Sequence, residues 1–194
     1  MADKRPYPVE LVQKWALRDG TRVVIRPIRA EDRQIEKDFV HDLSDESRYF
    51  RFFSALRDLS EAALTRFTQV DYDKEMALIA VICENGRETE IGVARYSIDP
   101  DGKRCEFAIA VADAWQRKGV GSKLMQSLMH AARSRGLEIM EGWLLTGNAR
   151  MLALMDGLGF AIQANAGNSS LRHVVKNLAT HDIPAGTVAN RETT

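Results

Sequence analysis

Hydrophobic and polar residues follow strand-like patterns in two parts of the chain, and short turn sequences separate the strands. Asp19-Gly20 lies between two runs of β character in WALRDGTRVVIRPI, and Asp-Gly in such a place is typical of a β-hairpin. Further β runs follow later: they are MALIAVICENG, TEIGVARYSI and KRCEFAIAV, separated by Asn85-Gly86 and Pro100-Asp101-Gly102. Turns this short join antiparallel neighbours, so we predict a hairpin and then an antiparallel meander.

Between these two groups of strands the pattern becomes helical. From Glu31 to Val40 the pattern is that of a helix, and Glu31 and Asp32 would lie in its first turn, where negative charge complements the helix dipole. Ser44 and Ser60 precede the segments DESRYFRFF and EAALTRF as N-caps would. We therefore predict one helix and two further short helices ahead of the meander.

The last third of the chain alternates between helices and strands. An amphipathic helix is predicted from Lys118 to Ser134, and another from about Asn148 to Leu158, where Gly159 would end it. Strands are predicted in LEIMEGWLL between these helices and near FAIQA and LRHVVKNL after them. This order of elements predicts an α+β fold.

Length and composition are those of one globular domain. With 194 residues, of which 45% are apolar, the chain can form one sizeable core. We assign residues 1–20 to an N-terminal segment with the first hairpin strand, and residues 21–178 to the domain itself. Residues 179–194 are small and polar, include Pro and Gly and have no periodicity, so we expect a disordered or loosely attached tail.

The charge balance and the apolar runs narrow the choice of partners. Lys plus Arg and Asp plus Glu number 27 each, so no overall field attracts nucleic acid or an anionic membrane. The longest apolar run, Met76 to Cys83, is too short to span a bilayer, and the first ten residues lack an apolar signal core. We expect a soluble cytoplasmic protein that binds neither nucleic acid nor membrane.

The metal-binding residue types are dispersed. Cys83 and Cys105 form no CxxC pair and lie in apolar strand-like runs, which is typical of buried free thiols. The four histidines are scattered along the chain. We therefore expect no metal site.

The segment QRKGVG places two glycines and two basic residues directly before the helix that ends at Ser134. A glycine turn entering a helix from a strand leaves the first N–H groups unpaired at the positive end of the dipole, which suits a phosphate. Gly119 and Gly121 would allow close approach, and Arg117 and Lys118 add positive charge. An ordinary glycine-containing helix entry would have the same spacing, so the spacing alone leaves both interpretations open.

QRKGVG resembles the acyl-CoA pyrophosphate loop of the GNAT acyltransferase superfamily. The resemblance extends over about residues 21–178, through VVIRPIRAED, FAIAV and NARMLALMDGLGF. Within the superfamily, ALRDGTRVVIRPIRAEDRQ, LSDESRYFRFF and TQVDYDKEMALIAV are similar to the acetyltransferase domain of Pat-type bacterial protein lysine acetyltransferases. This resemblance implies a GNAT-like fold with a mixed, mostly antiparallel central sheet, helices on both faces and a splayed strand pair that holds the cofactor.

The resemblance also implies acetyl-CoA as cosubstrate, without a metal. The main chain of Ile109 to Val111 would pair with pantetheine as an added strand does, and backbone N–H groups from Arg117 to Ser122 would hold the pyrophosphate. Asn148 matches a cofactor-contacting asparagine of the family, although a simple N-cap explains it equally well. The cofactor residues implied in this way are Ile109, Ala110, Val111, Gln116, Arg117, Lys118, Gly119, Val120, Gly121, Ser122 and Asn148.

Glu106 is the candidate general base. A lysine amine, with a pKa of about 10.4, is almost fully protonated at neutral pH, so its attack on a thioester needs a group that takes the proton. Glu106 lies on the strand before the loop, where Pat-like enzymes and several relatives carry a glutamate base. Glu141 on the next strand is the alternative base. Glu106 could also be an ordinary solvated carboxylate on a strand, without a catalytic role. The tyrosine that often acts as acid in the family would fall at Met155, so we assign no general acid.

The acceptor is the least determined part. Asp71, Asp73 and Glu75 could attract a cationic lysine or form a solvated loop. A second group could line an acceptor groove or pack a helix: Arg48, Tyr49, Arg51 and Phe52. The favoured function is N-acetyl transfer from acetyl-CoA to a protein lysine, possibly on an acyl-CoA synthetase. Transfer to a small amine or amino acid, and a non-catalytic acyl-CoA sensor, are the alternatives.

Overall fold

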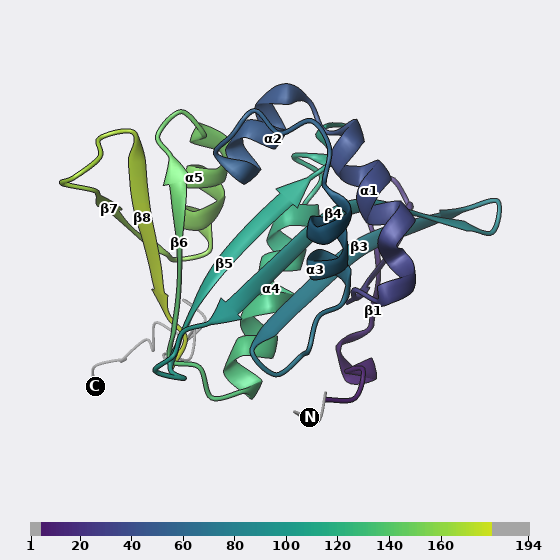
Figure 1. Cartoon of the computed structure of the whole chain (residues 1–194), viewed down its shortest axis with the longest axis horizontal. Coiled ribbons are helices and arrows are strands. Elements are labelled where there is room, and N and C mark those ends of the chain that lie inside the picture. Colours follow the sequence, from purple (N-terminus) through teal and green to yellow (C-terminus); the bar gives the residue numbers. More distant parts are fainter. Residues whose placement is uncertain (1–4, 180–194) are drawn as a thin grey trace, which may run out of the picture.

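The computed structural model describes residues 5–179, which form one eight-stranded sheet with helices on both faces (Figure 1). The strand order is β1-β2-β3-β4-β5-β6-β8-β7. The strands are β1 (Gln13–Ala16), β2 (Arg22–Pro27), β3 (Glu75–Glu84), β4 (Arg87–Ile98), β5 (Arg104–Val111), β6 (Ile139–Leu145), β7 (Ala161–Ala164) and β8 (Leu171–Asn177). The helices are α1 (Arg33–Asp42), α2 (Asp45–Phe52), α3 (Glu61–Thr68), α4 (Val120–Ser134) and α5 (Ala149–Gly157). The expected tail, residues 179–194, lies outside the described residues except for Ala179.

The first five strands of the sheet are antiparallel neighbours in chain order. Strands β1 and β2 form the predicted hairpin, and β3, β4 and β5 form the predicted meander. Gly20 and Gly86 have φ angles of 86° and 78° in the two tight turns, a region that glycine reaches without a steric cost. The turn sequences therefore give the strand connections directly.

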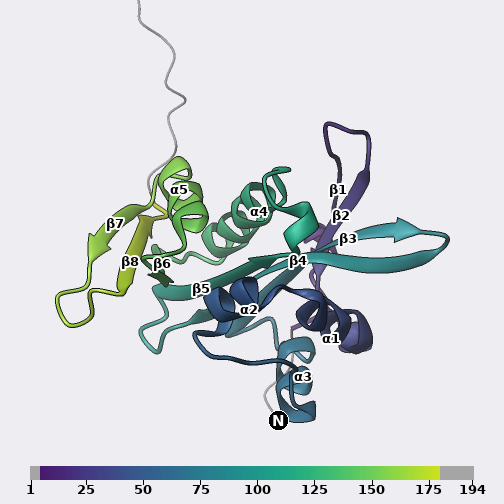
Figure 2. The ribbon, with the colours of Figure 1, turned by 90° about the horizontal axis from the view of Figure 1, so that it is seen from above.

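The helices divide between the two faces of the sheet (Figure 2). Helices α1, α2 and α3 lie on one face, where Arg95 of β4 contacts Glu36 of α1 and the Phe67 carbonyl of α3. Helices α4 and α5 lie on the opposite face, and α4 buries Leu124 and Leu128 completely against the strands. The implied arrangement of a mixed sheet with helices on both faces is confirmed.

The helix boundaries follow the capping residues. The Oγ atoms of Ser44 and Ser60 accept hydrogen bonds from the N–H groups of the third residues of α2 and α3, both at 3.2 Å, so both predicted N-caps are confirmed. Helix α4 begins at Val120 rather than Lys118, because Gly119 is its N-cap and has a left-handed backbone with φ 89°. The segment before α1 is a short 3₁₀ turn at Ala30–Asp32.

Strands β5 and β6 form the parallel contact that opens the sheet. Their register covers only Arg104↔Ile139, Cys105↔Met140 and Glu106↔Glu141, after which the strands separate (Figure 1). The Phe107 ring fills the space beside Gly142, where an added Cβ would lie 2.9 Å from Phe107 Cε1. The same ring packs on Phe160 with centroids 5.4 Å apart. A splayed strand pair, as the resemblance implies, is thus present between residues 106 and 111 of β5 and the facing part of β6.

The two cysteines differ in burial. Cys105 is fully buried in β5, as expected, but the expectation that Cys83 is buried is wrong, because its side chain is exposed. Cys83 lies close to the tip of the β3–β4 hairpin, which extends beyond the helices that cover the sheet (Figure 1). An apolar run therefore continues past the point where the core ends.

No helix within residues 5–179 is long and apolar enough to cross a membrane. No group of three or more His, Cys, Asp or Glu side chains in the same range could hold a metal ion.

A buried ion pair connects the start of α1 to the sheet. Arg26 of β2 donates from both terminal nitrogens to the two oxygens of Asp32, at 2.6 and 2.7 Å, and a third bond reaches Glu88. The side chains of Arg26 and Asp32 are only 4% and 8% exposed. Asp32 also accepts the Arg29 N–H, so it holds both the strand and the helix entry.

Replacing Asp32 by Ala should destabilise the fold strongly. The change leaves the Arg26 guanidinium buried without its main carboxylate, and breaking a buried pair in this way costs about 3–5 kcal/mol. Chemical denaturation would measure the loss in free energy of unfolding. Asp73→Ala is the matched control, because its pair with Arg5 is more than half exposed and should contribute no more than about 1 kcal/mol. Equal losses in the two variants would contradict this account of the buried pair.

Candidate active site

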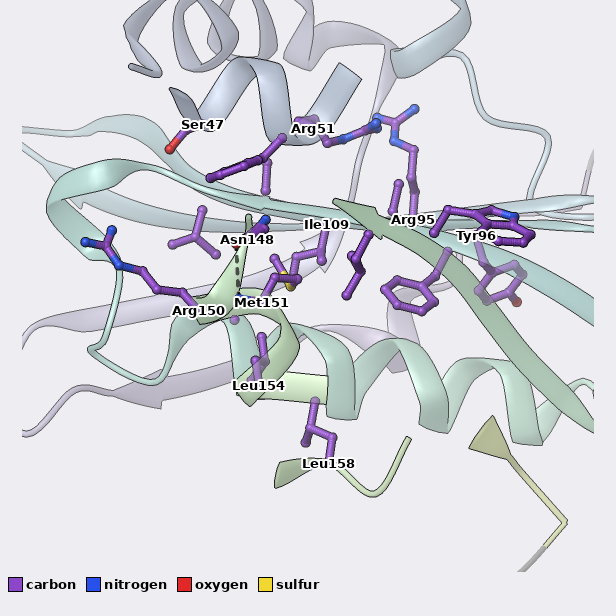
Figure 3. Close-up of a pocket in the computed structure, with 18 of the residues that line it drawn as sticks. Ser47, Arg51, Arg95, Tyr96, Ile109, Asn148, Arg150, Met151, Leu154 and Leu158 are labelled. Carbon is purple, nitrogen blue, oxygen red and sulfur yellow. Dashed lines mark hydrogen bonds between the residues drawn. The ribbon is translucent and has the colours of Figure 1, made fainter. Parts of the chain in front are cut away.

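A cavity of about 1080 Å³ opens where β5 and β6 separate (Figure 3). Its walls come from β4, β5, β6 and the first residue of β3, from α2, α3 and α5, and from the loop and first two turns of α4. Most of the expected site residues line it: they are Glu106, Ile109, Ala110, Val111, Gln116, Arg117, Gly119, Gly121, Ser122 and Asn148. One opening in the sheet therefore collects residues that are far apart in the sequence.

Only alternate residues of β5 form main-chain hydrogen bonds with β4. Ala112 N–H donates to Ile91 O at 3.0 Å, and in an antiparallel pair alternate residues make such bonds. Ile109 and Val111 therefore direct their N–H and C=O groups away from β4, toward the gap. Ala110, expected in the same set, directs its main chain toward β4. The Val111 carbonyl already accepts a hydrogen bond from Gln116 Nε2, so an extended, peptide-like ligand in the gap could satisfy the Ile109 N–H and C=O and the Val111 N–H as a new strand would.

The loop before α4 presents unpaired N–H groups. The first helical bond of α4 runs from Lys123 N–H to Gly119 O, and Gly119 offers no side-chain cap. The N–H groups of residues 120–122 therefore point out of the helix at the positive end of its dipole, where anions bind. Arg117 has a left-handed φ of 61°, which is uncommon for a residue with a side chain.

The remaining loop residues take different positions. Lys118 does not reach the cavity wall, because its ammonium lies 4.6 Å from the centroid of the Trp115 ring. Val120 is buried in the core, so only its main chain can serve a ligand. Gly121 faces α5, and a Cβ there would lie 3.2 Å from Leu154 Cδ2, tighter than an ordinary contact. Gly121 thus brings the helix start close to α5 and keeps the space between them open.

Gln116 connects several parts of the site. Its Nε2 donates to the Val111 carbonyl and to Ser47 Oγ, both at 3.2 Å, and its Oε1 accepts from Arg150 at 3.0 Å. These bonds hold α2 and α5 against the end of β5. The sequence placed Gln116 in the loop motif but gave no sign of this bridging.

Asn148 is both an N-cap and part of the cavity wall. Its Oδ1 accepts the Met151 N–H at 3.1 Å, while its amide nitrogen has no partner among residues 5–179 (Figure 3). The two interpretations of Asn148 are therefore compatible, since the oxygen caps the helix and the nitrogen stays available. Met155 is fully buried and does not line the cavity.

Glu106 has an exposed carboxylate on the face of the sheet that carries α1, α2 and α3. It lies opposite Ser97 of β4, and within residues 5–179 it has no hydrogen-bond or ion-pair partner. Partial burial raises its pKa, as do the nearby negative charges of Asp99 and Glu141, while His173 opposes them. A carboxylate with a raised pKa accepts a proton more readily than an ordinary one.

Glu141 lies beside Glu106 in the parallel register but is already engaged. Arg104 binds both of its oxygens, and His173 Nε2 lies 3.1 Å from Glu141 Oε2. Glu141 does not line the cavity, whereas Glu106 does. Of the two carboxylates, Glu106 is the one whose lone pairs are free to serve a reaction.

The acidic segment before β3 is mainly structural. Asp71 Oδ1 accepts the N–H groups of Asp73, Lys74 and Glu75, which shapes the loop, and Asp73 pairs with Arg5. Only Glu75 of this cluster lines the cavity. The interpretation as a loop therefore holds for Asp71 and Asp73.

The family model and the curated relatives that match this chain are described as acetyltransferases. Residues 37–160 match the family model described as "Acetyltransferase (GNAT) family". The chain is 35% identical to Acetyltransferase PA5475 of Pseudomonas aeruginosa, over 84% of this chain and 87% of that protein. It is 30% identical to Acetyltransferase Pat of Mycolicibacterium smegmatis, over 79% of this chain but only 44% of that longer protein. The crystal structure of the GNAT domain of S. lividans PAT superposes with a TM-score of 0.80 and 28% identity, covering 89% of this chain and 99% of that domain.

Replacing Gly121 by Glu should weaken acetyl-CoA binding at least about tenfold. The new side chain would meet Leu154 and bring negative charge to the unpaired N–H groups, which we expect to hold the pyrophosphate. Calorimetric titration would measure the change. Gly167→Glu adds the same charge on the exposed β7–β8 loop and should bind like wild type. Unchanged affinity in a folded Gly121→Glu variant would remove the loop assignment.

Proposed function

The chain belongs to the GNAT acetyltransferase family, and on that basis we propose that it transfers the acetyl group of acetyl-CoA to a lysine side chain of a protein. The observation that carries the proposal is the carboxylate of Glu106, which has no partner within residues 5–179 and faces the cavity beside the free main-chain groups of β5. The sequence resemblance to Pat-type protein lysine acetyltransferases supports a lysine acceptor. Glu75 and Asp99 line the same cavity, and their charges favour an incoming ammonium group.

The cofactor lies along β5 in this proposal. The N–H groups of residues 120–122 bind the pyrophosphate, and Arg117 adds a mobile positive charge. Pantetheine pairs with the N–H and C=O of Ile109 and with the N–H of Val111, and the amide nitrogen of Asn148 provides a further donor. This path brings the thioester toward Glu106, since that residue precedes Ile109 on the same strand.

Glu106 acts as the base. The carboxylate takes a proton from the lysine ammonium, directly or through a water, and the neutral amine attacks the thioester carbonyl carbon. A main-chain N–H at Ile109 or Val111 stabilises the oxygen of the tetrahedral intermediate. When the C–S bond breaks, the CoA thiolate takes its proton from water or from the ammonium nitrogen of the tetrahedral intermediate, because Met155 supplies none.

Positioning contributes more than proton transfer. Holding the amine and thioester in line lowers the barrier by about 7–11 kcal/mol, whereas a general base gives about 10²–10⁴-fold, or roughly 3–6 kcal/mol. The enzyme therefore depends most on the gap that holds both reactants.

Glu106→Gln should lower kcat at pH 7 by about 10²–10⁴-fold and leave acetyl-CoA affinity nearly unchanged, because the carboxylate moves a proton and touches no phosphate. The deficit should shrink as the pH rises toward 9–10, since more lysine amine is then already neutral. Release of free CoA across a pH series would measure both effects.

The matched control is Glu141→Gln, which changes the neighbouring carboxylate of the same register pair. This variant should keep most of the wild-type turnover, because Glu141 is held by Arg104 and His173. A large loss in Glu141→Gln together with normal turnover in Glu106→Gln would move the base to β6.

A folded protein should be a better acceptor than a short peptide. Contacts away from the reacting amine lower the barrier, so truncating the substrate should reduce kcat as well as affinity. We expect kcat/KM for the protein to fall as salt rises, because exposed charges are screened over about 8–10 Å. The assay compares purified acyl-CoA synthetases with peptides copied from their lysine loops, and mass spectrometry locates the acetyl group. Preference for a free small amine over both would favour the small-molecule alternative.

A further inference from the structure

Arginine side chains from three different elements meet around one aromatic ring in the cavity wall. Arg51 of α2, Arg66 of α3 and Arg95 of β4 lie 6.0, 5.2 and 4.3 Å from the centroid of the Phe67 ring. All three line the cavity that contains Glu106. The Arg51 and Arg95 side chains extend toward one another below α2 (Figure 3).

Arg51 has no anionic partner. Within residues 5–179 its guanidinium makes no hydrogen bond or ion pair, and its contacts are with the rings of Phe52 and Phe67. Burial, together with the positive charges of Arg95 and Arg66, lowers its pKa to about 10, although the negative charge of Glu36 opposes them. Arg51 is half-buried, and a partly desolvated arginine beside a second arginine is costly unless an anion accompanies it.

The surrounding carboxylates compensate only part of this charge. Glu36 lies 3.5 Å from Arg95, and Arg95 Nε has no hydrogen-bond partner. Glu90 is buried next to Glu36, and burial together with that neighbour raises its pKa well above the usual value. Glu75 also lines the cavity and offsets part of the charge on Arg95. Arg51 and the exposed Arg66 are left without a carboxylate in contact.

We propose that Arg51 and Arg95 bind a carboxylate of the acceptor while its amine reaches Glu106. The inference extends the proposed acetyl transfer and rests on it. Arg95 of β4 lies opposite Ala108 of β5. Glu106 is therefore the diagonal neighbour of Arg95 on the same face of the sheet, with Cα atoms about 7–8 Å apart. Two groups of one acceptor can span such a distance. The carboxylate comes either from an acidic side chain next to the lysine of a protein or from the α-carboxylate of a free amino acid.

The experiment compares acceptors that differ only in this carboxylate. One arm uses the blocked peptides Gly-Lys-Glu-Gly and Gly-Lys-Gln-Gly, and the other uses L-leucine and L-leucinamide. Release of free CoA gives kcat/KM for each acceptor with the full chain and with the Arg51→Gln variant. Comparing the carboxylate-to-amide ratio between the two proteins removes the difference in amine pKa between the acceptors.

We expect Arg51→Gln to reduce the carboxylate-to-amide ratio about tenfold in at least one arm, since hydrogen bonds to charged groups have effects of that size. A change in the peptide arm alone indicates an acidic residue beside the lysine, and a change in the amino-acid arm alone indicates an α-carboxylate. Arg57→Gln, which removes an exposed arginine from the loop after α2, should keep the wild-type ratio.

An unchanged ratio in both arms for a folded Arg51→Gln variant would overturn the inference and leave acetyl transfer intact. Absence of transfer to all four acceptors and to purified protein substrates would contradict the proposed function itself, and this inference with it. Arg51→Lys provides a second test, because it keeps the charge and should retain part of the ratio that Arg51→Gln loses.

Discussion

The short parallel contact between β5 and β6 is the constraint on which the site depends. The two strands pair over only three positions, from Arg104↔Ile139 to Glu106↔Glu141. Beyond them the Phe107 ring occupies the space beside Gly142, and a side chain at position 142 would collide with it. Because β5 keeps its full pairing with β4, the separation leaves free main-chain groups only on the side toward β6. The sheet is thus continuous on one side of β5 and open on the other.

Successive side chains of β5 point to opposite faces of the sheet, so this strand contributes residues to both faces. Ile109 and Val111 lie close to Gly121 at the start of α4, on the face with the phosphate-binding loop. Glu106 points to the opposite face, which carries α1, α2 and α3 and the arginines around Phe67. A cofactor in the gap can therefore meet an acceptor that arrives from the other face. Gln116 keeps this arrangement together, since it bonds to the end of β5, to α2 and to α5.

Local signals in the sequence predicted the local structure well. Asp19-Gly20 and Asn85-Gly86 gave the hairpin turns, and Ser44 and Ser60 gave the helix starts, because each of these features depends on a few neighbouring residues. The splayed pair came from the family resemblance, since pairing of β5 with β6 brings together segments separated by the whole of α4. Cys83 was placed wrongly because burial along a strand depends on which helices cover it.

The meeting of Arg51 with Arg95 depends on the packing of α2 and α3 over β4, which no short-range pattern encodes. Cofactor binding in the gap requires the free main chain of β5, and amide hydrogen exchange measured residue by residue by NMR tests this most directly. With acetyl-CoA bound, the Ile109 and Val111 amides should exchange more slowly, whereas Ala108 and Ala110, which already face β4, should change little. Slowing at Ala108 and Ala110 instead, or no slowing anywhere in β5 under saturating acetyl-CoA, would contradict the placement of the cofactor in the gap.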